Sequence, residues 1–257
     1  MDVEKRILLN RSSYVIFGEG IEMSNQFEQF DQLLEGPLRG LEPLEQEIFC
    51  SRLALYWADI ERPLRLLYGD RADYDTWRDH FLSLVARRYA GRPSELRMLD
   101  LERLAEDDWF QQPEMIGYVC YTERFAGDLP GVGEKIGYLK ELGVTYLHLM
   151  PLLKPRPGAN DGGYAVMDYR QVRDDLGTME ELAGLAKSLR ENDISLCIDL
   201  VCNHTAKEHE WALQAMAGDE DYQNYYLMFE DREWPDQYEQ TVREIFPEFK
   251  SGSFTYY

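Results

Sequence analysis

The sequence predicts a helical domain followed by a parallel α/β domain, and three observations indicate this fold class. Residues before about 113 repeat apolar side chains at helical spacing. From residue 113 onward, short apolar runs alternate with helical patterns, which is the element order of parallel α/β proteins. The 257 residues are 44% hydrophobic and 13% aromatic, which is enough to build a sizeable core.

The helical domain is predicted to hold three helices, each with one apolar stripe turned inward. The first spans about residues 44–67, the second begins at Asp73 as its N-cap, and the third begins at Pro93-Ser94. No chemistry is expected in this domain. The stripe residues are Ile48, Phe49, Leu53, Tyr56 and Trp57 in the first helix, Trp77, Phe81, Leu84 and Val85 in the second, and Leu96, Leu99 and Leu104 in the third.

Three strands are predicted in the α/β domain, over residues 116–121, 144–149 and 194–201. The third is apolar at nearly every position, which is typical of a strand that is covered on both faces. A Gly- and Pro-rich loop follows the second strand, and the regular pattern ends after about Asn203.

Two helices are predicted between these strands. The first covers residues 131–142, and Gly143 stands at the position of a left-handed C-cap. The second opens with the capping box Thr178-x-x-Glu181. Its inward residues are expected to be Leu182, Leu185, Ala186 and Leu189.

Charge and cysteine content indicate which partners and which cellular location to expect. Lys+Arg 27 against Asp+Glu 48 gives a net charge of −21, so nucleic acid and anionic membranes are poor partners. No run approaches the length of a membrane span, and the residues at 1–6 lack the apolar core of a signal peptide, so a cytoplasmic location is expected. A periplasmic location stays open. Buried reduced thiols are expected at Cys50, Cys120, Cys197 and Cys202, because no two of them form a CxxC pair.

Two loops at the same end of the predicted sheet carry candidate site residues. Asn160–Arg170 follows the second strand and Asp199–Thr205 ends the third, and working residues gather at the carboxyl ends of parallel strands. Each loop combines an acid with an aromatic ring or an imidazole. Such a set suits a neutral ligand rich in hydroxyls, since carboxylates accept from hydroxyls and an aromatic face packs on a sugar ring.

Metal and dinucleotide sites have weak support. His204 and His209 are five residues apart, which does not give the one-face spacing of a zinc motif. Gly131-Val-Gly133 lacks the third glycine of a dinucleotide fingerprint. No metal ion and no cofactor are therefore predicted.

The two loops resemble recurring motifs of the α-amylase family of retaining glycoside hydrolases and glucosyltransferases. Asp199-x-x-x-Asn203-His204 is similar to the first of these motifs, and Gly163-Tyr164-Ala-Val-x-x-Tyr169 is similar to the loop after the second strand. Within the family the nearest resemblance is to the amylosucrase group. It rests on Asp161-Gly-Gly-Tyr164, on Asn203-His-Thr with Glu208-His-Glu-Trp211, on Pro235-Asp-Gln-Tyr238 through Arg243-Glu-Ile-Phe-Pro247, and on a helical domain in front of the barrel.

The resemblance implies an incomplete TIM (β/α)₈ barrel. Residues 1–112 would be the helical N-terminal domain, 113–202 the first three βα units of the barrel, and 203–257 the start of an inserted, B-like subdomain. Roughly 145 residues follow residue 112, whereas a full barrel takes about 250. Open edges on such a partial barrel favour self-association.

The resemblance also implies roles for five residues, each with a plainer alternative. Asp161 would bond the distal hydroxyls of the transferred glucose, or only form a turn. Tyr164 would stack beneath that sugar, or be an ordinary strand-end tyrosine. His204 would bond a glucose hydroxyl, or be satisfied structure. Asp199 would organise the site from below, or satisfy backbone donors; Asn203 ligates calcium in many members, although the amylosucrase group is not implied to need that ion.

The family's covalent machinery is missing from the sequence. It uses a nucleophilic Asp in Arg-x-Asp after the fourth strand, an acid Glu after the fifth, and a His-Asp pair after the seventh. Neither Arg71-Ala-Asp73 nor Arg173-Asp-Asp175 ends an apolar strand, and no His-Asp pair occurs before Tyr257. We therefore expect an N-terminal portion that has no catalytic residue of its own and is inactive alone.

The function expected for the complete enzyme is that of a glucosyltransferase of amylosucrase type. Sucrose would supply the glucosyl unit, fructose would leave, and an α-glucan would accept the sugar with retention of configuration. Alternatives are a relative that processes sucrose, trehalose or maltose, and a non-catalytic carbohydrate-binding remnant. Sucrose and α-glucan are the expected partners.

Overall fold

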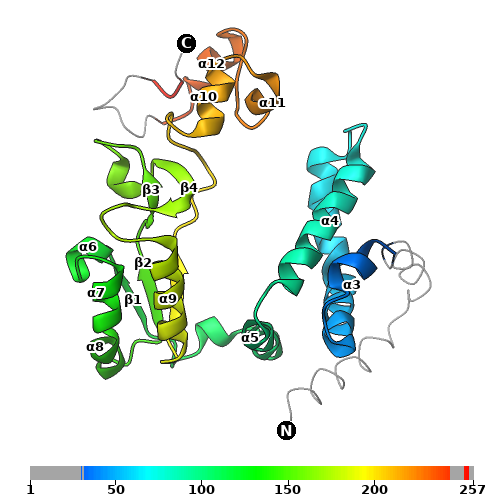
Figure 1. Cartoon of the computed structure of the whole chain (residues 1–257). Coiled ribbons are helices and arrows are strands. Elements are labelled where there is room, and N and C mark those ends of the chain that lie inside the picture. The colour runs from blue at the N-terminus through cyan, green and yellow to red at the C-terminus, as the bar shows by residue number, and fades with distance from the viewer. Residues whose placement is uncertain (1–29, 31, 244–251, 255–257) are drawn as a thin grey trace. The chain divides into compact units, whose positions relative to one another are not determined.

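The computed structural model describes residues 30, 32–243 and 252–254 (Figure 1). Its contacts divide the chain into two compact units, 1–111 and 112–257. The expectations about residues 1–6 and about the segment 246–251 lie outside the described residues. A further boundary at residue 203 stays a prediction.

The first unit is helical, as predicted. Helix α3 spans Pro43–Tyr68, α4 spans Tyr74–Ala90 and α5 spans Ser94–Ala105. A capping box between Glu42 and Glu45 opens α3. The core of this unit is made of Phe30, Leu34, Leu38, Leu41, Phe49, Leu53, Trp57, Leu82 and Ala86.

The apolar stripe of α4 differs from the predicted one. Leu82 and Ala86 are buried in the shared cluster, while Leu84 and Val85 are exposed. Trp77 and Phe81 are only half-buried, and their rings stack on each other at 5.9 Å. The buried stripe of α4 is therefore shifted to Leu82 and Ala86, and the aromatic rings of Trp77 and Phe81 stack at the edge of the helix contact.

The other two helices of this unit follow the prediction in part. Phe49, Leu53 and Trp57 of α3 are buried, but Tyr56 is exposed. In α5 only Leu101 is buried. Asp73 stands at the N-cap of α4, yet its carboxylate accepts from Arg71 at 2.9 Å instead of capping the helix, and this hydrogen bond lowers the pKa of Asp73.

The second unit is built on a parallel sheet of three strands in the order β1-β2-β5. The strands are Gly117–Cys120, Tyr146–Leu149 and Ser195–Ile198, so the three predicted strands are confirmed in shorter form. Between β1 and β2 the chain forms α6 (Thr122–Phe125), α7 (Leu129–Glu134) and α8 (Ile136–Glu141), and α9 (Met179–Arg190) leads into β5.

The two predicted helices between the strands differ in regularity. The capping box of Thr178 and Glu181 opens α9 as predicted. The helix predicted over 131–142 is instead two short helices that break at Lys135, because two glycines in its first turns weaken the helix. Gly143 follows with φ +76°, which confirms its left-handed C-cap role.

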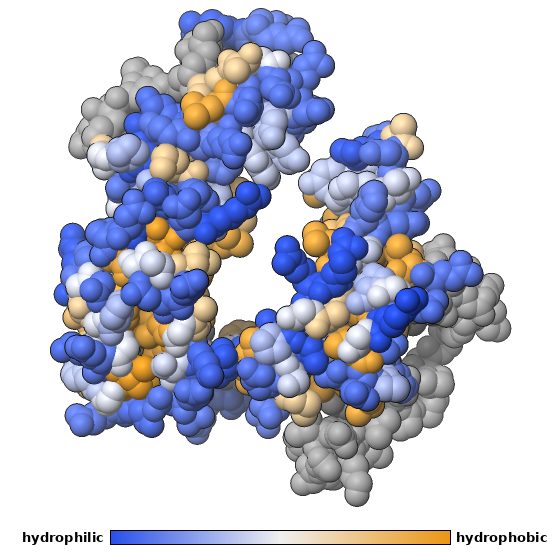
Figure 2. Space-filling model, in the orientation of Figure 1, coloured by the Kyte–Doolittle hydropathy of each residue, from blue (hydrophilic) through white to orange (hydrophobic). Residues whose placement is uncertain are grey.

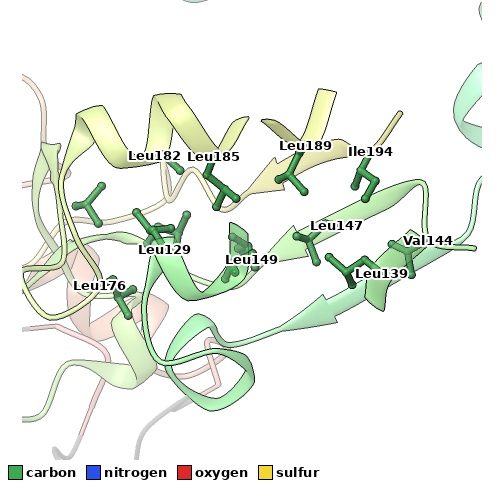
Figure 3. Packing of buried hydrophobic residues seen from close by; sticks show 13 residues of the cluster. Leu129, Leu139, Val144, Leu147, Leu149, Leu176, Leu182, Leu185, Leu189 and Ile194 are labelled. Carbon is green, nitrogen blue, oxygen red and sulfur yellow. The ribbon is translucent and has the colours of Figure 1, made fainter. Parts of the chain in front are cut away.

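The core of the second unit lies on one face of this sheet. The side chains of Leu147 and Leu149 are fully buried and meet the leucines of α9 (Figure 3). The members of this core cluster are branched aliphatic residues, and their side chains pack closely together and carry no polar atom. They are Leu129, Val132, Leu139, Val144, Leu147, Leu149, Leu152, Val172, Leu176, Leu182, Leu185, Leu189 and Ile194.

The opposite face of the sheet is uncovered within the described residues. Val119 in β1 is 60% exposed, and the residues in register with it on the same face, His148 and Cys197, are only half-buried. The prediction that the third strand is covered on both faces is therefore wrong for this structure. Strands β1 and β5 are the outer strands, and self-association through their edges stays a prediction.

An antiparallel strand pair lies where a loop was predicted. Strand β3 (Leu153–Pro155) pairs with β4 (Val166–Val172), with register shifts between the paired residues. The side chains of Leu153, Val166 and Val172 are buried and hold the pair on the rest of the unit. The prolines in this stretch argued against a strand, but an irregular two-stranded edge tolerates proline.

The first unit ends in the short helix η1 (Trp109–Gln111). The remaining short helices of the second unit are η2 (Asp161–Gly163), α10 (Glu210–Met216), α11 (Glu220–Gln223) and α12 (Glu233–Tyr238). Apolar surface is visible over the part of the unit that carries α7, α8 and α9 (Figure 2, orange). Among the described helices, none combines the length and apolarity that a membrane crossing requires.

Candidate functional site

The candidate site lies at the carboxyl ends of the parallel strands. Tyr121 directly follows β1, Pro151 comes two residues after β2, and Asp199 directly follows β5. Since the three strands are parallel and in register, these residues share one edge of the sheet. This edge is where the sequence placed its candidate residues.

The turn that carries Asp161 lies against the ends of β1 and β2. Asp161, Gly162 and Gly163 have φ values of +55°, +66° and +97°, so three successive residues are left-handed. A Cβ on Gly162 would lie 3.1 Å from the Tyr121 hydroxyl, and one on Gly163 would lie 3.1 Å from the Cβ of Pro151. The double glycine therefore lets the backbone approach the sheet edge closely.

The same turn is closed by its own polar groups. The Asn160 side-chain oxygen accepts from the Gly163 N–H at 3.1 Å, and the Asp161 carbonyl accepts from the Tyr164 N–H at 3.3 Å. These bonds fix the direction in which Asp161 and Tyr164 leave the turn. Left-handed backbone at a non-glycine residue such as Asp161 is uncommon and tends to occur at functional sites.

Tyr164 and Asp199 interact at the centre of the site. Burial raises the pKa of Tyr164, and the negative charge of the nearby Asp199 raises it further. Tyr121 and Asp161 act in the same direction through their charges. The structure thus brings together an acid from β5, a tyrosine after β1, and the two candidates from the turn.

We expect Tyr164 to titrate above the ordinary tyrosine value of about 10. Because the raised pKa favours the neutral phenol in the folded state, Tyr164 stabilises the fold below its unfolded pKa, and this contribution is lost as pH rises through the folded pKa. The measurement is an NMR titration of the tyrosine Cζ carbons, with Tyr164 assigned by Tyr164→Phe. Asp199→Asn should lower the midpoint; a wild-type midpoint at or below about 10 would contradict the prediction.

His148 is a site residue that the sequence reasoning did not assign. Its register partner is Cys197, so it shares the uncovered face of the sheet with Asp199, two residues further along. Nε2 of His148 lies 3.3 Å from Oδ2 of Asp199, at ion-pair distance but without hydrogen-bond alignment, and solvent reaches neither atom. In the sequence, His148 is a polar residue between two leucines of an apolar strand. This pattern could have identified it as a site candidate.

Asn203 and His204 lie in an exposed loop after β5. The Asn203 amide nitrogen lies 3.1 Å from Nδ1 of His204. The Tyr169 hydroxyl donates to the Val201 carbonyl at 2.6 Å and also lies 3.1 Å from the His204 carbonyl. Tyr169 is the last residue of the Gly163–Tyr169 motif, and no role was predicted for it. These contacts show that it ties the loop to β4.

The sequence also led to expectations about metal ligands and thiols. No group of three or more His, Cys, Asp or Glu within the described residues is arranged to hold a metal ion. All four cysteines are free, but Cys50, Cys120 and Cys197 are half-buried and Cys202 is exposed, so the prediction of buried thiols is wrong. Cys197 is only half-buried because it lies on the uncovered face of the sheet. The partial burial of Cys120 is still enough to raise the pKa of its thiol.

The assembled groups suit a neutral polyhydroxyl ligand. Asp161 supplies an acceptor at the mouth of the site, Tyr164 supplies a half-buried ring, and His204 supplies an exposed imidazole on the neighbouring loop. Asp199 is engaged by His148 and Tyr164, which suits it to hold neighbours in place. Hydroxyl recognition needs acceptors and donors of this kind around an aromatic face.

Known proteins similar to this chain come from one family. A sequence profile described as "Alpha amylase, catalytic domain" matches residues 75–257. An oligo-1,6-glucosidase of Bacillus cereus is 35% identical over 130 residues, which are 48% of this chain and 23% of the relative. A palatinase of Erwinia rhapontici is 34% identical over 122 residues, which are 44% of this chain and 22% of the relative. The structure of Bacillus licheniformis trehalose-6-phosphate hydrolase is 30% identical, with a TM-score of 0.42 over 46% of this chain and 22% of that one. The chain thus spans about a quarter of the length of these relatives.

Proposed function

The chain belongs to the α-amylase family, and on that premise we propose that residues 113–204 form the glucose-binding part of a retaining enzyme that acts on α-glucosides. The observation that carries the proposal is the Asp161–Tyr164 turn. It lies against the ends of β1 and β2, and Tyr164 lies close enough to Asp199 for the charge of that residue to raise its pKa. An acid and an aromatic ring are thereby presented at the edge where barrel enzymes bind their substrates.

Three residues would contact the glucosyl unit. Asp161 accepts hydrogen bonds from its distal hydroxyls, Tyr164 packs on the ring, and His204 donates to a hydroxyl near the reacting carbon. Asp199 would not contact the sugar itself, because it lies against His148 and acts on Tyr164 through its charge. Asn203 would hold the imidazole of His204. No metal ion is needed for these contacts.

We further propose that the whole enzyme is a glucosyltransferase of amylosucrase type. A carboxylate nucleophile attacks the glucosyl carbon of sucrose, an acid protonates the departing fructose, and the glucosyl-enzyme then passes its sugar to an α-glucan or to water. The nucleophile and the acid/base are not among the residues proposed here. The chain alone is therefore expected to bind sucrose without cleaving it.

A second candidate function keeps the chemistry and changes the substrate. The similar proteins of Bacillus cereus and Erwinia rhapontici are named as an oligo-1,6-glucosidase and a palatinase, so a hydrolase of another α-glucoside has support from sequence similarity. Both candidates share the glucosyl unit and differ in the sugar attached to it. A preference of the chain for sucrose over maltose and trehalose would favour the amylosucrase-type function.

Calorimetric titration of the pure chain with sucrose tests the proposal. We expect saturable binding without fructose release, and Asp161→Asn should weaken the affinity by about tenfold or more, because a charged acceptor is lost. Asp193→Asn is the matched control: Asp193 is also a left-handed aspartate (φ +59°), but it lies before β5, at the other end of the strands, so the same change should leave binding unchanged.

Two results would contradict the proposal. One is wild-type protein that fails to bind sucrose, maltose and trehalose alike. The other is a loss of affinity that is equal in Asp161→Asn and Asp193→Asn, which would indicate a charge effect and no specific contact. Stoichiometric fructose release that disappears in His204→Gln would overturn the separate expectation that the chain alone is inactive.

A further inference from the structure

The loop that carries Asn203 and His204 crosses the β3–β4 strand pair, and the contacts between them are specific. The Ala206 N–H donates to the Val166 carbonyl at 2.8 Å. The Tyr169 hydroxyl holds the loop further back, at the Val201 and His204 carbonyls. Since the side chain of His204 is exposed and its own ring contact is with its neighbour, its position depends on these anchors of the backbone.

A charged contact closes the far end of the same loop. Nη2 of Arg156, the residue after β3, lies 3.0 Å from Oε1 of Glu208, four residues beyond His204. The two side chains are 33% and 28% exposed. Nε of Arg156 and Oε2 of Glu208 are shielded from solvent and have no hydrogen-bond partner in the described part of the chain. Each charge is thus partly desolvated and depends on the other for compensation.

The ion pair between Lys154 of β3 and Asp174 is more exposed to solvent than the Arg156–Glu208 pair. Lys154 Nζ lies 3.1 Å from Asp174 Oδ1, but the Asp174 side chain is 76% exposed. Solvent screens such a pair, so its loss changes little. Of the two pairs, only Arg156–Glu208 joins the strand pair to the loop after β5.

We propose that the Arg156–Glu208 ion pair is a positioning device for His204. It rests on the proposed function, in which His204 contacts the glucosyl unit. Tyr169 fixes the loop at His204, Ala206 docks on β4, and Arg156 fixes Glu208, so the backbone between residues 204 and 208 is held at both ends. Arg156 and Glu208 touch no substrate in this proposal; they act through the loop.

Charge exchange tests the proposal in the full chain. The variants are Arg156→Glu, Glu208→Arg and the double exchange, with Lys154→Glu/Asp174→Lys as the matched control on the same strand. The primary readout is the long-range ¹H–¹⁵N spectrum of the imidazoles, because the chain has only 4 histidines. His204 is assigned with His204→Gln, and the exposed His80 serves as the internal reference. Sucrose affinity is the second readout.

We expect both single variants to move the His204 signals and to weaken sucrose binding by about tenfold. The double exchange should return the signals toward the wild-type positions and the affinity to within about twofold. The control exchange should leave both unchanged. Should a charge reversal unfold the protein, Glu208→Gln removes the charge with little change of shape and must still move the His204 signals.

Two results would overturn the proposal: His204 signals that stay at the wild-type positions in Glu208→Gln and in both single variants, or a double exchange that recovers neither readout although the protein is folded. Wild-type protein that binds no sugar would instead contradict the proposed function. The imidazole signals still decide the positioning role in that case, so the two failures are distinguishable.

Discussion

Replacing Leu147 with alanine is expected to lower the free energy of unfolding of the 112–257 unit by about 3 kcal/mol. Leu147 is fully buried at the middle of β2, the central strand, between the core residues of the helices on that face. The substitution removes apolar contacts and leaves a cavity that a packed sheet cannot close. Leu147 is therefore the position where a single truncation should cost most.

Hydrogen exchange of the β2 amides in the full chain measures this effect separately from the helical unit. A cost of about 3 kcal/mol corresponds to exchange that is faster by roughly a hundredfold. The matched control is Val119→Ala, in the adjacent strand but on the uncovered face, where the side chain is 60% exposed. It should change the free energy by no more than about 0.5 kcal/mol. Equal effects of the two substitutions would mean that the core is not on the face described here.

The contrast between Leu147 and Val119 also shows which features of the fold could be predicted from the sequence. The run 116–121 carries no strongly polar residue on either face, so it identifies a parallel strand without saying which face is covered. The helices after β1 and before β5 supply one covering layer, and the other face is left open within the described residues. Strand existence follows from local composition, whereas burial depends on which elements are present to pack on it.

The β3–β4 pair was missed for a similar reason. Pro155, Pro157 and Gly158 make the stretch look like an open loop, and nothing local reveals that Val166 and Val172 will bury their side chains beside Leu153. The pairing is also irregular, so no clean alternation marks it. Long-range contacts of this kind are not encoded in the spacing of one segment.

Part of the candidate site could also be predicted from the sequence, and part could not. The motif residues Asp161, Tyr164 and Asp199 could be named from the sequence, and their common edge follows from parallel strand order. The partners that hold them were not predicted. His148 reaches Asp199 across strands, and Arg156 reaches Glu208 across the loop, so both pairs exist only once the register is known.

The second large effect is expected at the turn that presents Asp161. Gly163→Ala should destabilise the 112–257 unit by about 2 kcal/mol, because φ +97° is a conformation that L-residues rarely adopt. The new Cβ would also lie 3.1 Å from the Cβ of the buried Pro151, so the turn must move away from the end of β2. Asp161 and Tyr164 would move with it, and sucrose affinity should fall together with stability.

The same substitution at Gly184 provides a control of opposite sign. Gly184 lies in α9 with ordinary backbone, and a Cβ there would meet nothing within 4 Å, so Gly184→Ala should stabilise the unit by about 0.5–1 kcal/mol. Hydrogen exchange of β2 and sucrose titration report the two effects for each variant. Gly163→Ala protein with wild-type stability and affinity would show that the turn does not need its left-handed glycine. In that case the close approach of the turn to the sheet would be incidental to sugar binding, and the carrying observation of the proposed function would lose its force.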